Sequence, residues 1–509
     1  MNVERFLAHH GITERPFEAE EARHDAVFER MIDHSPCHPD FSKVLGDLTP
    51  PSTAIVFGEK GSGKTAIRLQ IDHRVAAHNR SHPSQRILLV PYDDLNPLLD
   101  RVIERRRRKV VRDASIDDLL KRFRLVDHQD AILSLAVTAL VDRLVEKRSD
   151  DGDAPADLDA SIKRMPRRAR VDLAVLAALY DQPRSGGLLA RWRRARGRLR
   201  TGWVPPVSMT SLGAAVLAVG AATLLILSLF GEAATLYRVG AASVAALALL
   251  LVIFWIWDRV GLWFRCRRIC RDLVSVERTN AQLRRMMLDL RRSDLSSQVW
   301  PHGGEDGSNS RYELTSSLLD GLEHLGYCGI MVIVDRVDEP TSVSGQPERM
   351  RAIIWPMLDN KFLQQSRFGF KLLLPIELRH QLFRESSTFF QEARLDKQSM
   401  IERLSWSGAT LYDLCTSRLR ACSARDDDDD LTLNDLFEQD VSRVMIIDAL
   451  DQMQQPRDAF KFLYNVIQEH CRMVPSDDEN YRISRITLDT VRRAQAQRVQ
   501  ELHRGLAPA

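Results

Sequence analysis

The chain has 509 residues, enough for a large folded core with two or three smaller units. Hydrophobic residues make up 44% and charged residues 28%, which allows a packed interior under a solvated surface. The formal net charge of +3 is too small to indicate a nucleic-acid-binding protein. The seven cysteines show no zinc-site spacing, and they favour a reducing compartment.

The first 100 residues predict an N-terminal lobe and the first half of an α/β core. An apolar strand over residues 54–57 leads into a glycine-rich turn and a helix over 64–78, and a second strand covers 87–90. Residues 101–200 predict a helical insertion. Within it, an apolar stripe indicates a long amphipathic helical region over 114–147.

Residues 201–264 predict a transmembrane hairpin. Residues 207–230 and 239–257 carry no charged side chain, and as helices they would measure about 36 and 29 Å against a hydrocarbon core of about 30 Å. Arginines crowd both flanks, so the positive-inside rule places both flanks in the cytoplasm. The alternative interpretation is a pair of fully buried core helices.

Residues 265–310 predict an amphipathic helix, over 272–297, and a polar linker. Residues 311–424 predict the second half of the α/β core, with a helix over 312–325 and strands over 329–334, 370–374 and 400–404. Residues 425–509 predict a C-terminal helical part.

Residues 58–65 match the Walker A pattern in full, between a predicted strand and a predicted helix. Glycines allow backbone N–H groups to surround phosphates, and the helix start adds its positive dipole end. We expect Lys64 to reach the β- and γ-phosphates and Thr65 to bind magnesium. The predicted nucleotide-binding residues are Gly58, Glu59, Lys60, Gly61, Ser62, Gly63, Lys64, Thr65 and Ala66.

The strand over 329–334 ends at Asp335, which makes Asp335 the candidate Walker B carboxylate that holds magnesium. Asp338 and Glu339 follow, and either one is a candidate to polarise the attacking water. Together with Lys64 they form the predicted catalytic set. The alternative interpretation is a buried strand followed by an acidic turn. The hairpin lies between the two motifs, so sequence on both sides of it must complete one sheet.

An intact Walker A motif, hydrophobic spans between it and Walker B, and Asp338 three positions after Asp335 resemble the KAP family of P-loop NTPases. This family belongs with the STAND class and, more distantly, with AAA+ ATPases. The resemblance implies a P-loop parallel sheet with helices on both faces, and ATP and Mg²⁺ as cofactors. The family often has a second aspartate after the first, where this chain has Arg336. Arg336 is therefore also a candidate for a subunit-bridging or phosphate-sensing arginine.

Other resemblances concern single segments. Residues 455–458 are similar to a sensor-2 motif, in which Arg457 would touch the γ-phosphate; the alternative is an ordinary helix start. Residues 11–17 are similar to the segment that packs on adenine in related ATPases; the alternative is a hydrophobic anchor for the N-terminal turn. Arg394 and Arg403 are candidate arginine fingers acting in a neighbouring subunit, and Glu377 occupies a sensor-1 position.

These features predict a membrane-anchored, nucleotide-dependent switch that hydrolyses ATP. The resemblance implies signalling, membrane-complex assembly or defence against phages and plasmids, with a homo-oligomer and an unknown protein partner. Both termini and the NTPase domain are expected in the cytoplasm, at an inner or plasma membrane. The alternatives are a nucleotide-gated pore, disfavoured by uncharged spans, and a scaffold that does not hydrolyse nucleotide.

Overall fold

The structure is a computed structural model that describes residues 1–19, 21–33, 36–109, 115–145, 158–183, 187–202, 209–230, 234–303, 307–424, 431–475 and 478–503. The chain divides into two compact units. The first, here called the sheet unit, comprises Met1–Pro97, Leu120–Arg122 and Cys328–Ala509. The second, the helical unit, comprises Leu98–Leu119 and Phe123–Tyr327.

The sheet unit is built on a five-stranded sheet in the order β2-β3-β4-β1-β5. Its strands are β1 (Ala54–Gly58), β2 (Arg86–Tyr92), β3 (Tyr327–Val334), β4 (Phe368–Pro375) and β5 (Ser399–Ile401). The pairs β1–β4, β1–β5 and β3–β4 are parallel. Strands β1 and β4 are buried along their whole length, as expected for parallel strands covered on both faces. The predicted α/β class is confirmed, and both halves of the core contribute to one sheet.

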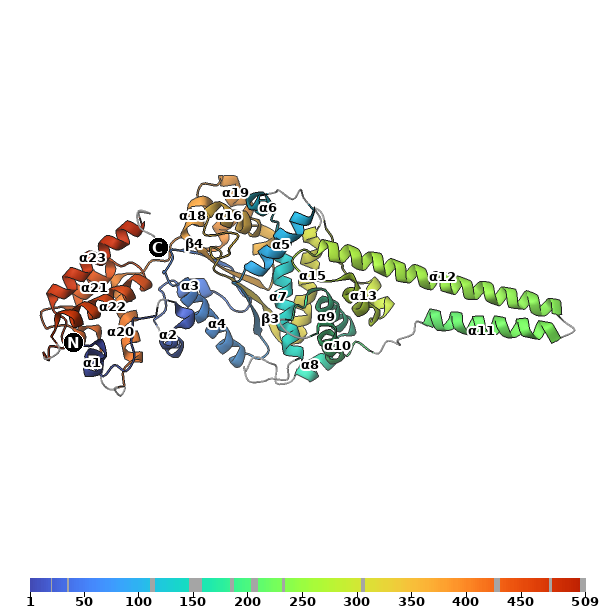
Figure 1. The fold of residues 1–509 in the computed structure, drawn as a ribbon, viewed down its shortest axis with the longest axis horizontal. Coiled ribbons are helices and arrows are strands. Elements are labelled where there is room, and N and C mark those ends of the chain that lie inside the picture. Colours follow the sequence, from blue (N-terminus) through green and yellow to red (C-terminus); the bar gives the residue numbers. More distant parts are fainter. Residues whose placement is uncertain are drawn as a thin grey trace. The chain divides into compact units, whose positions relative to one another are not determined.

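Helices cover both faces of this sheet (Figure 1). Helices α3 and α4 pack on one face through a shared apolar cluster that includes Val44, Ile71, Val56 and Leu373. On the other face, the ring of Phe362 in α17 lies 4.5 Å from that of Phe370. The helices of this part are α3 (Phe41–Leu45), α4 (Lys64–Ser81), α16 (Pro347–Ile354), α17 (Asn360–Leu363), α18 (Ile376–Leu382) and α19 (Ser387–Ala393).

The sheet unit also holds a cluster of C-terminal helices, which bury an apolar core with residues from the start of the chain. Phe6, Ile12 and Phe17 belong to the same cluster as Leu411 and Phe462. The N-terminal segment therefore packs with the C-terminal helices. The elements concerned are α1 (Val3–His9), α2 (Ala26–Met31), α20 (Gly408–Ala421), α21 (Arg443–Asp451), α22 (Pro456–Met473) and α23 (Arg485–His503).

The predicted helical region over 114–147 contains two helices, α6 and α7, and the Asp127 carboxylate accepts the N–H of Arg124 at the start of α7. The predicted helix over 272–297 is wrong, because Thr279 and Gln282 form a capping box that starts α13 anew. The helices are α5 (Asn96–Lys109), α6 (Ile116–Leu120), α7 (Leu125–Val145), α8 (Leu158–Arg164), α9 (Arg167–Tyr180), α10 (Leu188–Leu199), α11 (Met209–Phe230), α12 (Ala234–Asp272), α13 (Asn280–Leu288), α14 (Arg292–Ser296) and α15 (Gly307–His324).

Helices α11 and α12 lie side by side and antiparallel (Figure 1), with Gly213 facing Leu251 and Gly240 facing Leu224. Only one helix in the described part of the chain, Arg238–Asp272 within α12, is long and apolar enough to cross a membrane. The apolar stretch described in α11, Leu212–Leu227, is shorter. A hairpin of two spanning helices, as predicted from the sequence, is therefore not established.

The side chains of both helices nevertheless argue against the alternative of buried core helices. Val219 is 70% exposed, Val239 67% and Trp257 73%. Of the most apolar stretch in α12, only 11% is buried within the protein. Apolar surface of this extent requires a cover that the described chain does not provide.

Candidate functional site

The loop between β1 and α4 has the geometry of a phosphate-binding turn. Strand β1 ends at Gly58 and α4 begins at Lys64, as the sequence predicts. Gly61 and Gly63 both have a φ of +93°, where side chains other than hydrogen are strained. The first N–H groups of α4 have no partner within the helix, so they are available to an anion held by this loop.

Lys64 folds back on the loop that precedes it. Its ammonium Nζ donates to the carbonyl oxygens of Gly58, at 2.6 Å, and Glu59, at 2.8 Å. Burial lowers the pKa of Lys64, while the nearby carboxylates of Asp338 and Asp335 oppose that change. The lysine is thus a partly buried cation close to several acidic side chains.

Asp335 reaches this loop from β3, with one strand, β4, between β3 and β1. The hydroxyl of Thr65 donates to Asp335 Oδ2 at 3.3 Å, although the two residues are 270 positions apart. Asp335 is 1% exposed, and its Oδ1 accepts the N–H of Arg336 at 2.9 Å. Burial raises the pKa of Asp335, and Lys64 opposes the rise. The two predicted motifs therefore meet at the carboxyl edge of one sheet, where α/β proteins bind ligands.

The two acids after Asp335 face different surroundings. Glu339 is exposed, and its carboxylate pairs with the guanidinium of Arg336, whose φ of 60° is left-handed. Asp338 is half-buried, and its charge is the strongest of those that act on Lys64. The charge of Asp338 therefore acts on the lysine of the loop, whereas Glu339 is held by its neighbour.

Residues 455–457 lie against the P-loop from the start of α22. The N–H of Arg457 approaches the Gly61 carbonyl at 3.5 Å, and a Cβ on Gly61 would lie 3.0 Å from the Cβ of Arg457. The buried Nε of Arg457 has no hydrogen-bond partner among the described residues. The predicted sensor-2 arginine thus lies beside the loop, with donor capacity to spare.

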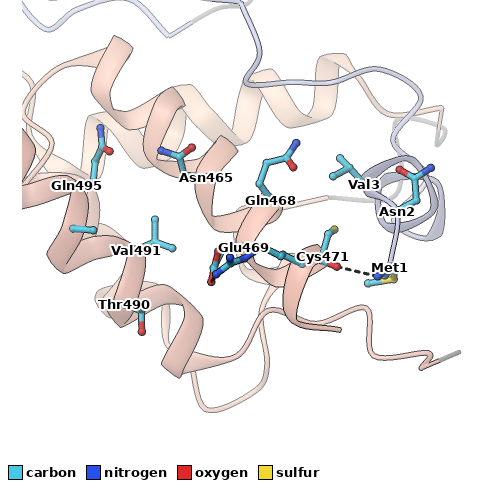
Figure 2. Close-up of a pocket in the computed structure, with 12 residues that line it drawn as sticks. Met1, Asn2, Val3, Asn465, Gln468, Glu469, Cys471, Thr490, Val491 and Gln495 are labelled. Carbon is cyan, nitrogen blue, oxygen red and sulfur yellow. Dashed lines mark hydrogen bonds and ion pairs between the residues drawn. The ribbon is translucent and has the colours of Figure 1, made fainter. Parts of the chain in front are cut away.

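The segment predicted to pack on adenine is buried at Ile12 and Phe17, in the cluster with the C-terminal helices. This supports the anchor interpretation, but Phe17 also lines a cavity of about 200 Å³ together with Arg457, Phe460 and Tyr464. A second cavity, of about 690 Å³, lies between α1, α22 and α23 (Figure 2). None of the predicted site residues lines it.

Sequence reasoning missed an ion-pair cluster beside Asp335. Arg68, on α4, lies 2.7 Å from the carboxylate of Asp93, and Asp93 directly follows β2. Burial raises the pKa of Asp72, also on α4, to about 6. The sequence did offer an indication, because Asp93 closely follows a predicted strand, as Asp335 does.

The remaining candidates are also placed. Arg403 pairs at 2.8 Å with Glu59 of its own P-loop, which does not fit a finger reaching into another subunit. Arg394 ends α19 in a left-handed conformation, away from any contact described with the loop. Glu377 lies in the first turn of α18, and its charge acts on Lys64.

A magnesium ion would find few protein ligands here. The described residues contain no group of three His, Cys, Asp or Glu side chains that could hold a metal. Magnesium, however, usually takes one or two protein oxygens together with phosphate oxygens and water. The Thr65 hydroxyl and the Asp335 carboxylate, 3.3 Å apart, supply such a pair.

We found no match to this chain among protein-family models, curated proteins or solved structures. Function must therefore be argued from the site itself.

Proposed function

We propose that the chain is a P-loop nucleoside triphosphatase that binds and hydrolyses ATP with Mg²⁺, and that its apolar helical hairpin anchors it in a membrane. The observation that carries the proposal is the pair formed by Thr65, at the start of α4, and the buried Asp335, at the end of β3. A distant carboxylate beside the hydroxyl of a Walker A threonine serves no evident packing purpose. The affiliation with the KAP family, and ATP rather than another triphosphate, belong to this proposal through the resemblance.

Binding would use groups that are poorly satisfied in the free protein. The N–H groups of the loop and of the first turn of α4 would hold the phosphates, helped by the helix dipole. Lys64 would exchange the carbonyls of Gly58 and Glu59 for phosphate oxygens. An ammonium bonds an anion more strongly than a neutral carbonyl, so the exchange favours the bound state.

Thr65 and Asp335 would hold Mg²⁺ with the phosphates, and the ion would supply charge neutralisation of the transferred phosphoryl group. The backbone N–H of Arg336 donates to Oδ1 of Asp335 and so helps to fix the orientation of the carboxylate, whose Oδ2 faces Thr65. Lys64 favours the charged form of that carboxylate and so opposes the rise in the pKa of Asp335 that burial causes.

Asp338 is the acid we assign to polarising water. It is half-buried and its charge acts on Lys64, the residue that would reach the β- and γ-phosphates. A carboxylate there accepts the proton of an attacking water. Glu339 remains the alternative, but its pairing with Arg336 would first have to break.

The switch would use the C-terminal helices. Arg457 lies beside Gly61 with a buried Nε that lacks a partner among the described residues, so a phosphate near the loop would give it one. That contact would draw the start of α22 toward the nucleotide, and hydrolysis would release it. A homo-oligomer and an unknown protein partner also belong to the proposal, from the resemblance.

The membrane anchor is proposed from the exposed apolar faces of α11 and α12. Helix α11, with 22 residues, would measure about 33 Å, close to the thickness of a hydrocarbon core. Helix α12, with 39 residues, is longer than a span needs, so its arginine-rich end would continue outside the bilayer. Carbonate extraction of membranes tests this part, since a protein held only by surface contacts would be released.

Phosphate release by the purified full chain, compared with Lys64→Ala and Asp338→Asn, tests hydrolysis. We expect both variants to lose release and Asp338→Asn to keep nucleotide binding. Release that is unchanged in Lys64→Ala would overturn the proposal. Binding without any release by the wild type would leave the scaffold alternative.

A further inference from the structure

Outside the phosphate-binding groups, a cluster of side chains surrounds the carboxylate of Glu59. Arg403 lies 2.8 Å from Oε1, and the side-chain amide of Gln455 donates to Oε2. Arg403 follows β5, and Gln455 directly precedes α22. The second residue of the P-loop therefore joins two segments that are otherwise separate in the chain.

The backbone beside this cluster is also attached to the loop. Trp406 donates its indole N–H to the Ser62 carbonyl at 2.9 Å, and the Leu404 N–H donates to Phe57 at 2.8 Å. These contacts use backbone carbonyls, of Ser62 in the loop and of Phe57 in β1, which phosphates do not need. The segment 403–406 and the start of α22 can thus remain near the loop when its N–H groups take an anion.

The members of the cluster differ in how freely they can move. The side chain of Arg403 is 52% exposed and that of Glu59 only 17% exposed, whereas Gln455 is 5% exposed. A half-exposed ion pair costs little to break, so Arg403 can leave Glu59. Gln455 cannot move without the start of α22.

A carboxylate on a phosphate-binding loop repels the ligand of that loop unless a cation neutralises it. Here that cation is Arg403, whose guanidinium binds carboxylate and phosphate oxygens in the same way. An incoming phosphate and Glu59 therefore compete for one guanidinium.

We propose that Glu59, Arg403 and Gln455 form a latch that closes the empty P-loop. Glu59 holds Arg403 and, through Gln455, the start of α22. A bound triphosphate takes the Arg403 guanidinium, and the start of α22 is then held by the proposed contact of Arg457 with phosphate in place of the contact of Gln455 with Glu59. Arg403 thereby acts as a phosphate-binding residue within its own chain. The release step rests on the proposed nucleotide binding, whereas the closed latch does not.

The chain offers a matched control. Glu402, the residue before Arg403, pairs with Arg379 at 2.7 Å. The side chain of Arg379 is 30% exposed and that of Glu402 is 56% exposed. This pair has similar chemistry and exposure, but no described contact with the P-loop. Glu402→Gln and Arg379→Gln therefore measure the effect of losing a surface ion pair in the same region.

The test measures affinity of the full chain for a fluorescent ATP analogue in Glu59→Gln, Arg403→Gln, the double variant and the two controls. We expect Glu59→Gln to raise the affinity and Arg403→Gln to lower it, each by about three- to tenfold. In the double variant, where Arg403 is already replaced, Glu59→Gln should raise the affinity by less than about twofold. Hydrogen exchange of the nucleotide-free chain over 454–460 should quicken in Glu59→Gln and Arg403→Gln, and stay unchanged in both controls.

Each outcome decides a part of the proposal. Additive effects of the two substitutions on affinity overturn the exchange of Arg403 from carboxylate to phosphate. Unchanged hydrogen exchange in both variants overturns the closed latch. A wild type that binds no nucleotide, but whose variants exchange faster, overturns the proposed function and the release step while supporting the closed latch.

Discussion

Each unit contains a cluster of charged side chains around a buried carboxylate, and the two clusters are satisfied differently. In the helical unit, Arg311 binds both carboxylate oxygens of Asp130, at 2.9 and 3.0 Å, and Tyr180 donates to the same carboxylate. Among the described residues of the sheet unit, Lys64 bonds only to backbone carbonyls, those of Gly58 and Glu59, and the Asp335 carboxylate accepts one hydroxyl and one N–H. The first arrangement is complete without a ligand, and the second is not.

The difference separates a structural cluster from a candidate functional one. A bidentate guanidinium–carboxylate pair with further donors satisfies its buried charges in a fixed geometry. Buried charges with few partners shift their pKa values and gain from a ligand, which is why such groups gather at functional sites. Both clusters are buried, so burial by itself would not have distinguished them.

The largest effect is expected from breaking the complete cluster. Arg311→Met leaves the Asp130 carboxylate buried without its cation, which should lower the free energy of unfolding by about 3–5 kcal/mol. Chemical denaturation measures this loss. The double variant with Asp130→Leu should recover much of it, and no recovery would contradict the comparison.

The helical unit is incomplete in a different sense, because the apolar faces of α11 and α12 are uncovered. Leu250→Arg places a charge in the proposed span, where insertion should cost about 2.5–3.5 kcal/mol, so less protein should resist carbonate extraction. Phe264→Arg, at an equally exposed site beyond the apolar run, is the control. Equal retention of both variants would count against a spanning α12.

The incomplete cluster should respond in activity rather than in stability. Asp338→Asn should lower the rate of phosphate release about a hundredfold, with nucleotide affinity and unfolding little changed, because it removes the proton acceptor alone. Glu339→Gln should have a much smaller effect, since Arg336 already holds that carboxylate. The reverse order would reassign the catalytic acid.

The smallest effect concerns Lys371, a buried lysine in β4. It donates to the carbonyls of Leu45 and Ser52, yet burial lowers its pKa to about 7. Above that pH the unfolded chain binds a proton that the folded chain lacks, so this lysine makes stability rise with pH between about 7 and 10.

Substitution of Lys371 by Met should remove this pH dependence. Between pH 7 and 9 the wild type should gain about 2 kcal/mol relative to the variant. Unfolding curves at several pH values measure how the free energy of unfolding changes with pH. In the variant the two carbonyls lose their donor, but this cost is the same at every pH and does not affect the slope. Parallel curves would show that Lys371 stays charged through its hydrogen bonds.

The sequence was informative where local chemistry determines structure. The P-loop needs glycine at positions with positive φ and a helix start, and Gly61, Gly63 and Lys64 provide them. The strand ending at Asp335 was recognisable because parallel strands buried on both faces form continuous apolar runs. These two features predict that Thr65 and Asp335 lie together, as the structure shows.

The sequence was less informative where contacts join distant segments. Nothing local to Glu59 indicates that its carboxylate meets Arg403 and Gln455, because that pairing depends on how the C-terminal helices pack. The helix predicted over 272–297 failed because a strong cap at Thr279 outweighed an apolar periodicity. Similarly, the acids after Asp335 could be ranked only once Arg336 was seen to hold Glu339.

The most direct test of the central claim is the magnesium dependence of nucleotide affinity in the wild type, Thr65→Val and Asp335→Asn. If Thr65 and Asp335 reach one metal ion, Mg²⁺ should tighten binding in the wild type and have little effect in either variant, while affinity without Mg²⁺ stays similar in all three. A wild type that binds no nucleotide, or variants that respond to Mg²⁺ as the wild type does, would contradict the account.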